Sequence, residues 1–192
     1  MKPILLYRRA AHAAINVGTS IFGNLIVEAG GTLEAGISSL YPLTIYGSLR
    51  SYKAGFINLS RAKVFGDVIL DGNSKNGISG RGVGLYELTV SGDIEIYGYE
   101  IAIDALKGIN VQDSYIGRNL IVESNAVRNI NLAYNQVGKN IIVKRNDTIA
   151  SMWVEGNTAG NRVVCKGNIP VPTNNKANFA PKGVEGQCAD LI

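Results

Sequence analysis

Three stretches of this chain repeat one pattern: IGRNLIVESN at residues 116–125, VGKNIIVKRN at 137–146 and AGNRVVCKGN at 159–168. Each has glycine in second place, a run of apolar residues in the middle and asparagine at the end. Two copies one residue shorter, FGNLIVEAG and FGDVILDGN, begin at Phe22 and Phe65. Internal repetition at a fixed period indicates a solenoid, in which each repeat packs only on its neighbours.

The repeat covers most of the chain when its copies are aligned on their glycine. The aligned residues are Gly23, Gly47, Gly66, Gly92, Gly117, Gly138 and Gly160. Their successive spacings are 24, 19, 26, 25, 21 and 22 residues. The chain therefore has room for about seven or eight rungs of roughly 22 residues. We expect the glycine to supply a sharp bend that other residues reach only with strain.

A second strand signal lies upstream of most of these glycines. It is an apolar-polar-apolar triplet, seen at residues 15–17, 57–59, 109–111, 130–132 and 152–154. Such triplets are half-buried strands whose flanking residues point inward. No long stretch has the 3.6-residue period of an amphipathic helix. We therefore predict an all-β, single-domain right-handed parallel β-helix over residues 15–168. Residues 1–14 are expected to cap it with a short helix, and residues 169–192 to form a loop-rich C-terminal capping tail.

The rung pattern, together with Leu70-Asp71-Gly72-Asn73 and Gly77-Ile78-Ser79-Gly80, resembles the pectin-lyase-like superfamily over nearly the whole chain. That resemblance implies the parallel β-helix fold. It also implies a candidate activity, because the superfamily includes polysaccharide lyases and hydrolases. These enzymes work with carboxylates and a basic residue on one outer sheet. The stretch from Val164 to Cys188 resembles the ends of small secreted bacterial β-helix proteins of unassigned function.

Two further features follow from rungs stacked on one another. Asn125, Asn146 and Asn168 share one offset from their glycines and should form a ladder at a corner. Cys165 and Cys188 are 23 residues apart, close to one rung, which places their Cα atoms about 5 Å apart, within reach of a disulfide. A disulfide predicts an oxidising compartment, extracellular or periplasmic; the alternative is two buried thiols in a cytosolic protein.

Several classes of function are disfavoured. His12 is the only histidine, which argues against Ser-His-Asp and Cys-His catalysis, and no metal site or cofactor is expected. The glycine cluster of residues 80–84 lacks the context of a phosphate-binding loop. The net charge of +4 is interleaved along the chain, so we expect no nucleic-acid partner. No apolar run reaches the roughly 18 residues of a membrane span, and residues 1–9 are a poor signal peptide.

An enzymatic interpretation rests on carboxylates in the middle rungs. The candidates are Asp71, Asp93, Glu95 and Asp104, with Arg118 on the next rung as a charge partner. In Asp93-Ile94-Glu95-Ile96 the isoleucines should point inward and the carboxylates outward. A carboxylate pair can act as general acid and base, although solvated charges on a solenoid surface give the same pattern.

A binding interpretation rests on the outward middle positions of the triplets. Asn16, Asn58, Asn110, Asn131 and Trp153 should fall on one face as an amide-rich strip with an indole at one end. Amides and aromatic faces suit sugars, and tyrosines such as Tyr86, Tyr97, Tyr99, Tyr115 and Tyr134 could add stacking surface.

The function expected from these patterns is a non-enzymatic, secreted or surface-associated β-helix that binds carbohydrate or a cell-surface component. The alternatives are a pectin-lyase-like carbohydrate-active enzyme and a structural or assembly module of a surface or phage-type particle. The sequence leaves the oligomeric state open.

Overall fold

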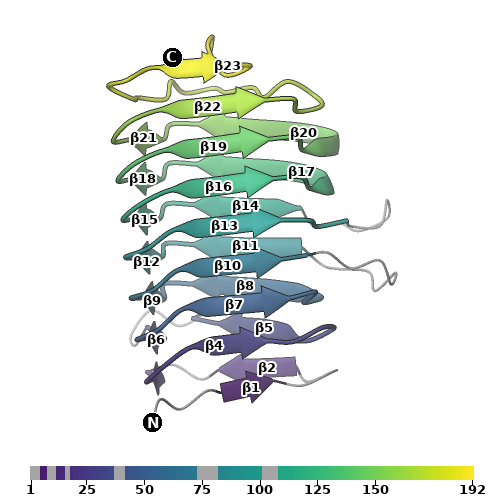
Figure 1. Ribbon diagram of the computed structural model, residues 1–192, viewed down its shortest axis with the longest axis vertical. Coiled ribbons are helices and arrows are strands. Elements are labelled where there is room, and N and C mark those ends of the chain that lie inside the picture. The colour runs from purple at the N-terminus through teal and green to yellow at the C-terminus, as the bar shows by residue number, and fades with distance from the viewer. Residues whose placement is uncertain (1–4, 8–11, 16–17, 37–41, 73–81, 101–107) are drawn as a thin grey trace.

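The protein is a parallel β-solenoid of about seven turns (Figure 1). A computed structural model describes residues 5–7, 12–15, 18–36, 42–72, 82–100 and 108–192. Within these ranges every regular element is a strand, and three parallel sheets run the length of the stack. The described residues contain no helix long and apolar enough to cross a membrane.

The nine-stranded sheet, called sheet A, forms one side of the solenoid. Its strands in stacking order are β1 (Leu5–Tyr7), β4 (Leu25–Val27), β7 (Leu49–Tyr52), β10 (Val68–Asp71), β13 (Ile94–Tyr97), β16 (Leu120–Glu123), β19 (Ile141–Lys144), β22 (Val163–Lys166) and β23 (Val184–Gly186). Neighbours in this order are three strands apart in the chain, except for the last pair, because the chain visits the other sheets in between.

Two seven-stranded sheets complete each turn. Sheet B comprises β2 (His12–Ile15), β5 (Thr32–Ala35), β8 (Phe56–Ser60), β11 (Gly82–Tyr86), β14 (Ile109–Gln112), β17 (Ala126–Ala133) and β20 (Asp147–Glu155). Sheet C comprises the two-residue strands β3 (Ser20–Ile21), β6 (Thr44–Ile45), β9 (Lys63–Val64), β12 (Thr89–Val90), β15 (Tyr115–Ile116), β18 (Gln136–Val137) and β21 (Thr158–Ala159). Each rung thus has three strands, in agreement with the two or three short strands per turn expected of a parallel β-helix.

The described residues of the first rung form strands, in place of the short helix expected in residues 1–14. Leu5–Tyr7 and His12–Ile15 are strands, and Ala13 pairs in register with Leu33 of β5. The helix prediction for residues 1–14 is therefore wrong where the chain is described. A ladder partner satisfies the backbone groups of this alanine-rich segment, and that pairing overrides its helix propensity.

The C-terminal tail traces one more, mostly irregular turn around the same three sheets. Single parallel bridges join Ile169 to Asp147, Thr173 to Trp153 and Phe179 to Thr158, and β23 then pairs with β22. The tail thereby lies across the last rung.

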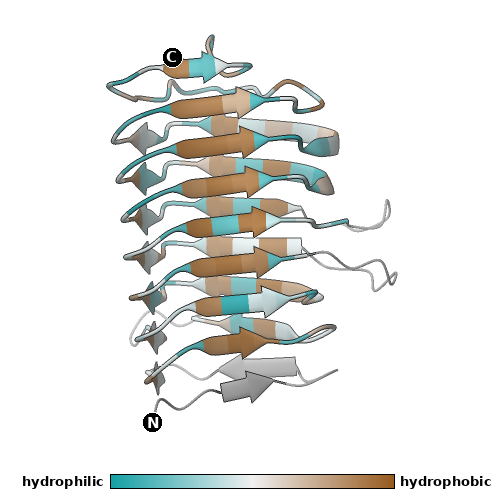
Figure 2. Ribbon diagram, in the orientation of Figure 1, coloured by the Kyte–Doolittle hydropathy of each residue, from teal (hydrophilic) through white to brown (hydrophobic). Residues whose placement is uncertain are grey.

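β-Branched and leucine side chains fill the interior. Figure 2 shows that the strands of sheet A consist mainly of hydrophobic residues. Ile94 and Ile96 are both fully buried, whereas Asp93 and Glu95 stay partly exposed, as the alternation predicted. Because rungs stack about 4.8 Å apart, each inward side chain packs on the equivalent one above and below it.

The repeat glycines have a different role from the one expected. Only Gly23 among them has a φ between +20° and +160°. A Cβ at Gly138 would instead meet the carbonyl oxygen of Gly117, and a Cβ at Gly160 that of Gly138. Glycine is needed here because the backbones of adjacent rungs approach closely.

The repeat glycines lie at the corner between sheets C and A, and left-handed backbone occurs at the other two corners. Seven of the described residues that adopt it there are not glycine. Lys53, Ser124 and Arg145 adopt it between sheets A and B; Arg61, Glu87, Asp113 and Tyr134 adopt it between sheets B and C. Asn125, Asn146, Ser114 and Asn135 each come directly after one of these left-handed residues, and all four belong to the hydrogen-bonded ladders described next.

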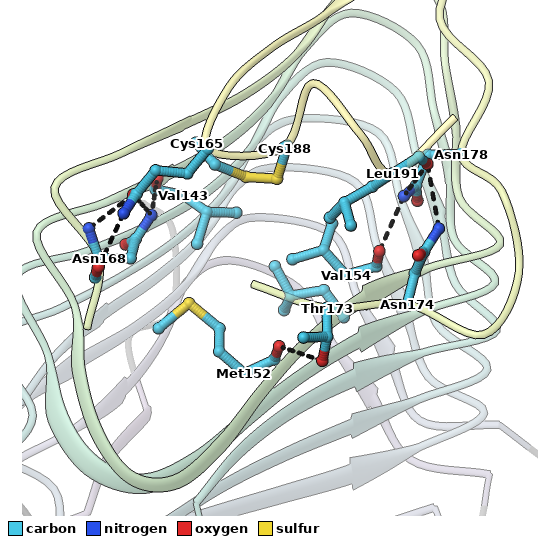
Figure 3. Close-up of a disulfide and its surroundings, with 12 residues drawn as sticks. Val143, Met152, Val154, Cys165, Asn168, Thr173, Asn174, Asn178, Cys188 and Leu191 are labelled. Atoms are coloured by element: carbon cyan, nitrogen blue, oxygen red, sulfur yellow. Dashed lines mark hydrogen bonds between the residues drawn. A yellow bond between two sulfur atoms is a disulfide. The ribbon is translucent and has the colours of Figure 1, made fainter. Parts of the chain in front are cut away.

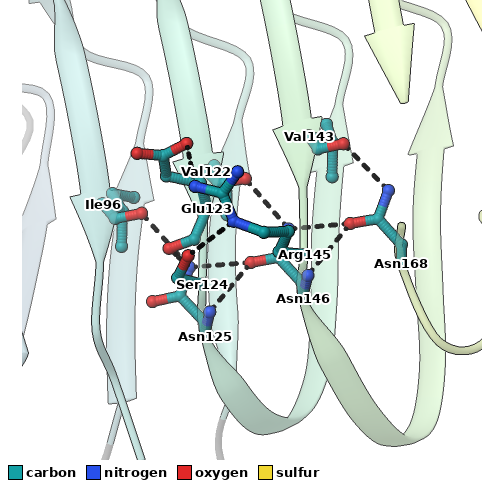
Figure 4. Close-up of polar contacts among 9 residues, drawn as sticks. All are labelled: Ile96, Val122, Glu123, Ser124, Asn125, Val143, Arg145, Asn146 and Asn168. Atoms are coloured by element: carbon teal, nitrogen blue, oxygen red, sulfur yellow. Dashed lines mark hydrogen bonds and ion pairs between the residues drawn. The ribbon is translucent and has the colours of Figure 1, made fainter. Parts of the chain in front are cut away.

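The predicted asparagine ladder is confirmed (Figure 4). Asn125 donates its backbone N and Nδ2 to Oδ1 of Asn146 at 3.1 and 2.9 Å, and Asn146 donates in the same way to Asn168. Each Nδ2 also donates to a backbone carbonyl of the preceding rung. These buried amides are fully hydrogen-bonded.

A second ladder, of Ser114, Asn135, Asn157 and Asn178, follows the corner between sheets B and C. A third follows the corner between sheets C and A through Asn24, Ser48, Asp67, Asp93, Asn119 and Asn140. All three corners of the solenoid are therefore held by side-chain hydrogen bonds between rungs.

A disulfide fastens the tail to the last regular rung (Figure 3). Cys165 and Cys188 have a Cα–Cα distance of 5.2 Å, and both side chains are buried. Leu191 packs against the core beside them, and its carbonyl accepts hydrogen bonds from Asn174 and Asn178. The tail thus covers the apolar interior at this end.

Candidate functional site

The amide strip predicted from the triplets lies on the outer face of sheet B. Strand register aligns Glu34, Asn58, Gly84, Asn110, Asn131 and Trp153 in one row, and Thr173 bridges to Trp153. Asn58, Asn110, Asn131 and Trp153 are each partly exposed. Asn16 is outside the described residues, and the register partner of Glu34 in β2 is Ala14.

A glycine interrupts the row, and an aromatic ring covers the gap. A Cβ at Gly84 would lie 2.7 Å from Cε2 of Tyr86 and 2.8 Å from Oδ1 of Asn58. The Tyr86 ring therefore lies over Gly84, beside Asn58. Burial raises the pKa of the Tyr86 hydroxyl. Aromatic rings therefore lie at two places along the row: the Tyr86 ring over Gly84, and Trp153. Asn110 and Asn131 stand between these two places.

Asn131 has an unpaired polar atom within this row. Its Oδ1 is buried and has no hydrogen-bond partner among the residues that the structure describes. A buried amide oxygen without a partner costs about 1–3 kcal/mol relative to a paired one. In this respect Asn131 differs from the corner asparagines, whose amides are hydrogen-bonded.

The tyrosines divide into exposed and buried groups. Tyr115 and Tyr134 are about half exposed, and the Nζ of Lys176 lies 5.4 Å from the Tyr134 ring centroid. Tyr99 is buried, with burial raising its pKa, so the expectation that it adds stacking surface is wrong. Its ring packs over Gly72, where a Cβ would collide with it.

Three exposed rings stack at the corner between sheets C and A. Phe22, Tyr46 and Phe65 follow their sheet C strands on successive rungs. Their centroids are 4.8 and 5.3 Å apart, and their planes are nearly parallel. Because Tyr46 lies between the other two rings, both of its faces are covered and it presents mainly its edge to solvent.

Two of the predicted catalytic residues contact each other at the corner between sheets C and A. The Arg118 guanidinium lies 2.9 Å from Oδ2 of Asp93 and 2.6 Å from Oδ1 of Asp67. Oδ1 of Asp93 accepts from the backbone N and Nδ2 of Asn119. Oδ1 of Asp93 therefore belongs to the third ladder, and Oδ2 of Asp93 forms the ion pair with Arg118. Asp67 was missed, although it follows Gly66 as Asp93 follows Gly92.

Glu95 lies beside this cluster on the outer face of sheet A. Burial, followed by the charges of Asp93, Asp67 and Glu123, raises the pKa of Glu95, and Arg50 opposes the shift. Asp71 is in register with Tyr97, two positions further along the strand than Glu95. Asp104 lies outside the described residues. The structure thus joins Asp93 and Arg118, sets Glu95 beside them and places Asp71 in another row.

Comparison with protein-family models, with curated proteins and with solved structures finds no match, so the function has to be argued from the geometry of the chain itself.

Proposed function

We propose that this protein is a non-enzymatic binding solenoid that holds a carbohydrate on the outer face of sheet B. The observation that carries the proposal is the row of partly exposed amides, Asn58, Asn110 and Asn131, with the partly exposed indole of Trp153 at its end. Sugar hydroxyls can hydrogen-bond with the exposed parts of these amides, and the indole face of Trp153 can pack against sugar C–H groups.

The row also favours a particular kind of glycan. Glu34 at its N-terminal end is the charged member, and the positions from Asn58 to Trp153 carry amides, a glycine and an indole. A neutral polysaccharide suits such a surface because no ion pair is needed. Rungs are about 4.8 Å apart, roughly the length of one sugar residue in an extended chain. The polymer would then run along the solenoid axis.

The test is binding to a panel of neutral and acidic polysaccharides, by glycan array and by calorimetry. Trp153→Ala should weaken binding of the best neutral ligand at least tenfold, and Asn131→Leu should weaken it because the amide is lost. Glu95→Gln, on sheet A, is the matched control and should bind like the unaltered protein. Equal affinity of all four proteins would refute the proposal.

The disulfide supports a place of action outside the reducing cytosol. We place the protein in an extracellular or periplasmic setting, where polysaccharides are abundant. Modification of Cys165 or Cys188 by a thiol reagent in protein taken directly from its native compartment would contradict this location.

A polysaccharide lyase or hydrolase of the pectin-lyase-like type is the second candidate. The raised pKa of Glu95, next to Asp93, Asp67 and Arg118, is the observation in its favour, since a general acid needs a proton at working pH. Release of unsaturated or reducing sugar from acidic polysaccharides, abolished in Glu95→Gln, would establish this candidate over binding alone.

A further inference from the structure

The outer face of sheet A has two outward rows that span most of the stack. The first, in stacking order, is Ile26, Arg50, Ile69, Glu95, Ile121, Ile142, Val164 and Glu185. The second is Tyr52, Asp71, Tyr97, Glu123, Lys144 and Lys166. Ile121, Ile142 and Val164 form an unbroken, partly exposed aliphatic strip in the first row.

The residues of these rows match in pairs about the rung of Ile121 and Glu123. The two members of a pair stand in the same row, one a given number of rungs before that rung and the other the same number after it. Three rungs before that rung stands Arg50, and three rungs after it stands Glu185. Two rungs before it are Ile69 and Asp71; two rungs after it are Val164 and Lys166. At these positions positive is matched with negative, and apolar with apolar; Glu185 also forms an ion pair with Arg162 of its own chain, at 3.3 Å.

We infer that sheet A is the interface of a homodimer in which two copies pack face to face with their solenoid axes antiparallel. The two-fold axis runs along the strand direction at the rung of Ile121. Each Ile121 then contacts its symmetry mate, Ile69 packs on Val164 of the second copy, and Asp71 meets Lys166. Tyr97 falls opposite Lys144, a geometry suited to a cation–π contact.

Charge makes a second copy in this orientation the best occupant of the face. A parallel pairing with its two-fold axis over the second row would set Asp71 against Asp71 and Lys166 against Lys166, whereas the antiparallel one pairs opposite signs. Two positions fit less well. Glu95 lies opposite Ile142, and Glu123 meets its own copy, although the Arg145 guanidinium, 3.3 Å from Glu123, supplies a counter-charge.

The matched part of this face is small. From Arg50 to Glu185 it covers seven rungs, and six steps of about 4.8 Å give a contact ~29 Å long and one strand wide. That is less than the roughly 800 Å² per partner of a standard interface, so the dimer should be weak and depend on concentration. The second copy leaves sheet B uncovered, so the inference is independent of the proposed glycan binding.

Cysteine cross-linking tests the geometry of this interface in the full chain. Both native cysteines are used in the disulfide, so a single introduced thiol reports only on contacts between copies. Packed sheet faces are about 10 Å apart, so a short bifunctional thiol reagent is used in place of direct oxidation. Ile121→Cys should be cross-linked rapidly into a covalent dimer, because its two thiols face each other at the two-fold axis. Ile142→Cys is the matched control and should be cross-linked more slowly, because its two copies are also offset by two rungs, ~10 Å, along the solenoid axis.

Charge reversal tests the pairing, with mass measured by sedimentation over a range of concentrations. Asp71→Lys and Lys166→Asp should each weaken the dimer at least tenfold, and the double variant should restore it. Asp71 and Lys166 are four rungs apart within one chain, so the rescue can arise only between chains. A monomer at every concentration, equal cross-linking of Ile121→Cys and Ile142→Cys, or absence of rescue would overturn the inference.

Discussion

Asn125 donates two hydrogen bonds to a single side-chain oxygen, Oδ1 of Asn146 on the next rung. The geometry resembles a backbone ladder continued by side chains. Asn146 in turn donates its Nδ2 to Val122 and to Asn168, so all the hydrogen-bonding positions of its amide are occupied. One residue therefore links three successive rungs at a buried corner.

Replacing Asn146 should destabilise the solenoid strongly. Asn146→Leu leaves the buried backbone N–H of Asn125 without its acceptor and removes the donor to the carbonyl of Val122, which should cost about 2–4 kcal/mol. The midpoint and slope of urea unfolding measure the change. Asn175→Leu, at an exposed position of the tail, is the control and should change stability by less than about 0.5 kcal/mol. Equal effects of the two substitutions would contradict a role for the ladder.

Two glycine substitutions separate close approach from backbone conformation. Gly138→Ala directs a methyl group at the carbonyl of Gly117 and should cost about 2–3 kcal/mol by overpacking. Gly167 has a φ of +67°, and its added Cβ would have 3.8 Å to the nearest atom, so Gly167→Ala should cost only about 1 kcal/mol. Thermal unfolding of both variants gives the comparison. The reverse order would mean that left-handed backbone, not rung spacing, selects glycine.

Loss of the disulfide should loosen the tail first. The bond closes a segment of 23 residues, for which the chain-entropy model gives about 3 kcal/mol. In the Cys165→Ala/Cys188→Ala variant, amide exchange should rise in residues 184–192 and stay low in β13 and β16. Uniform acceleration along the whole chain would show instead that the bond stabilises every rung equally.

The stability effect of Glu95 should depend on pH in the direction set by its raised pKa. A carboxyl with a folded-state pKa above its unfolded value destabilises the fold when ionised, and the penalty disappears as pH falls through the folded pKa. Glu95→Gln should therefore raise the melting temperature at pH 7, by an amount that shrinks toward pH 4.

Glu87 provides a control of opposite sign. Its hydrogen bond to Arg61 lowers the pKa of Glu87, so ionised Glu87 favours the fold above its unfolded pKa. Glu87→Gln should lower the melting temperature at pH 7, with the difference lost in acid. A melting temperature that rises in both variants would point to a general charge effect.

The sequence predicted the parts of this fold that repeat residue by residue. Asn125, Asn146 and Asn168 share an offset and a residue type, so their ladder could be anticipated, and the disulfide followed from a separation of one rung. The ladder of Asn135, Asn157 and Asn178 has the same kind of signal at 21–22 residues, but it was overlooked. The third ladder mixes Asn, Ser and Asp, so residue identity gives no pattern there.

The candidate site was predictable in its position but not in its chemistry. Alternation placed Asn58, Asn110, Asn131 and Trp153 in one row because their triplets share a register. The unpaired oxygen of Asn131 and the Tyr86 ring over Gly84 depend on side-chain conformations that no periodic pattern encodes. The use of Asp93 in a ladder likewise depends on which neighbour its oxygens reach.

The ladders of Asn125 and of Asn135 point the same way: each side-chain amide donates to a carbonyl of the preceding rung and also to the ladder residue of the next rung, toward the C-terminal end. At that end the final donors are already taken: Asn168 gives its own to Gln187, and Asn178 gives its own to Leu191. A terminal rung with vacant amide hydrogens would be a template on which another molecule could lay its first strand and so begin a filament. Gln187 and Leu191 accept these hydrogen bonds and so prevent such growth. The disulfide between Cys165 and Cys188 holds both residues against the last rung.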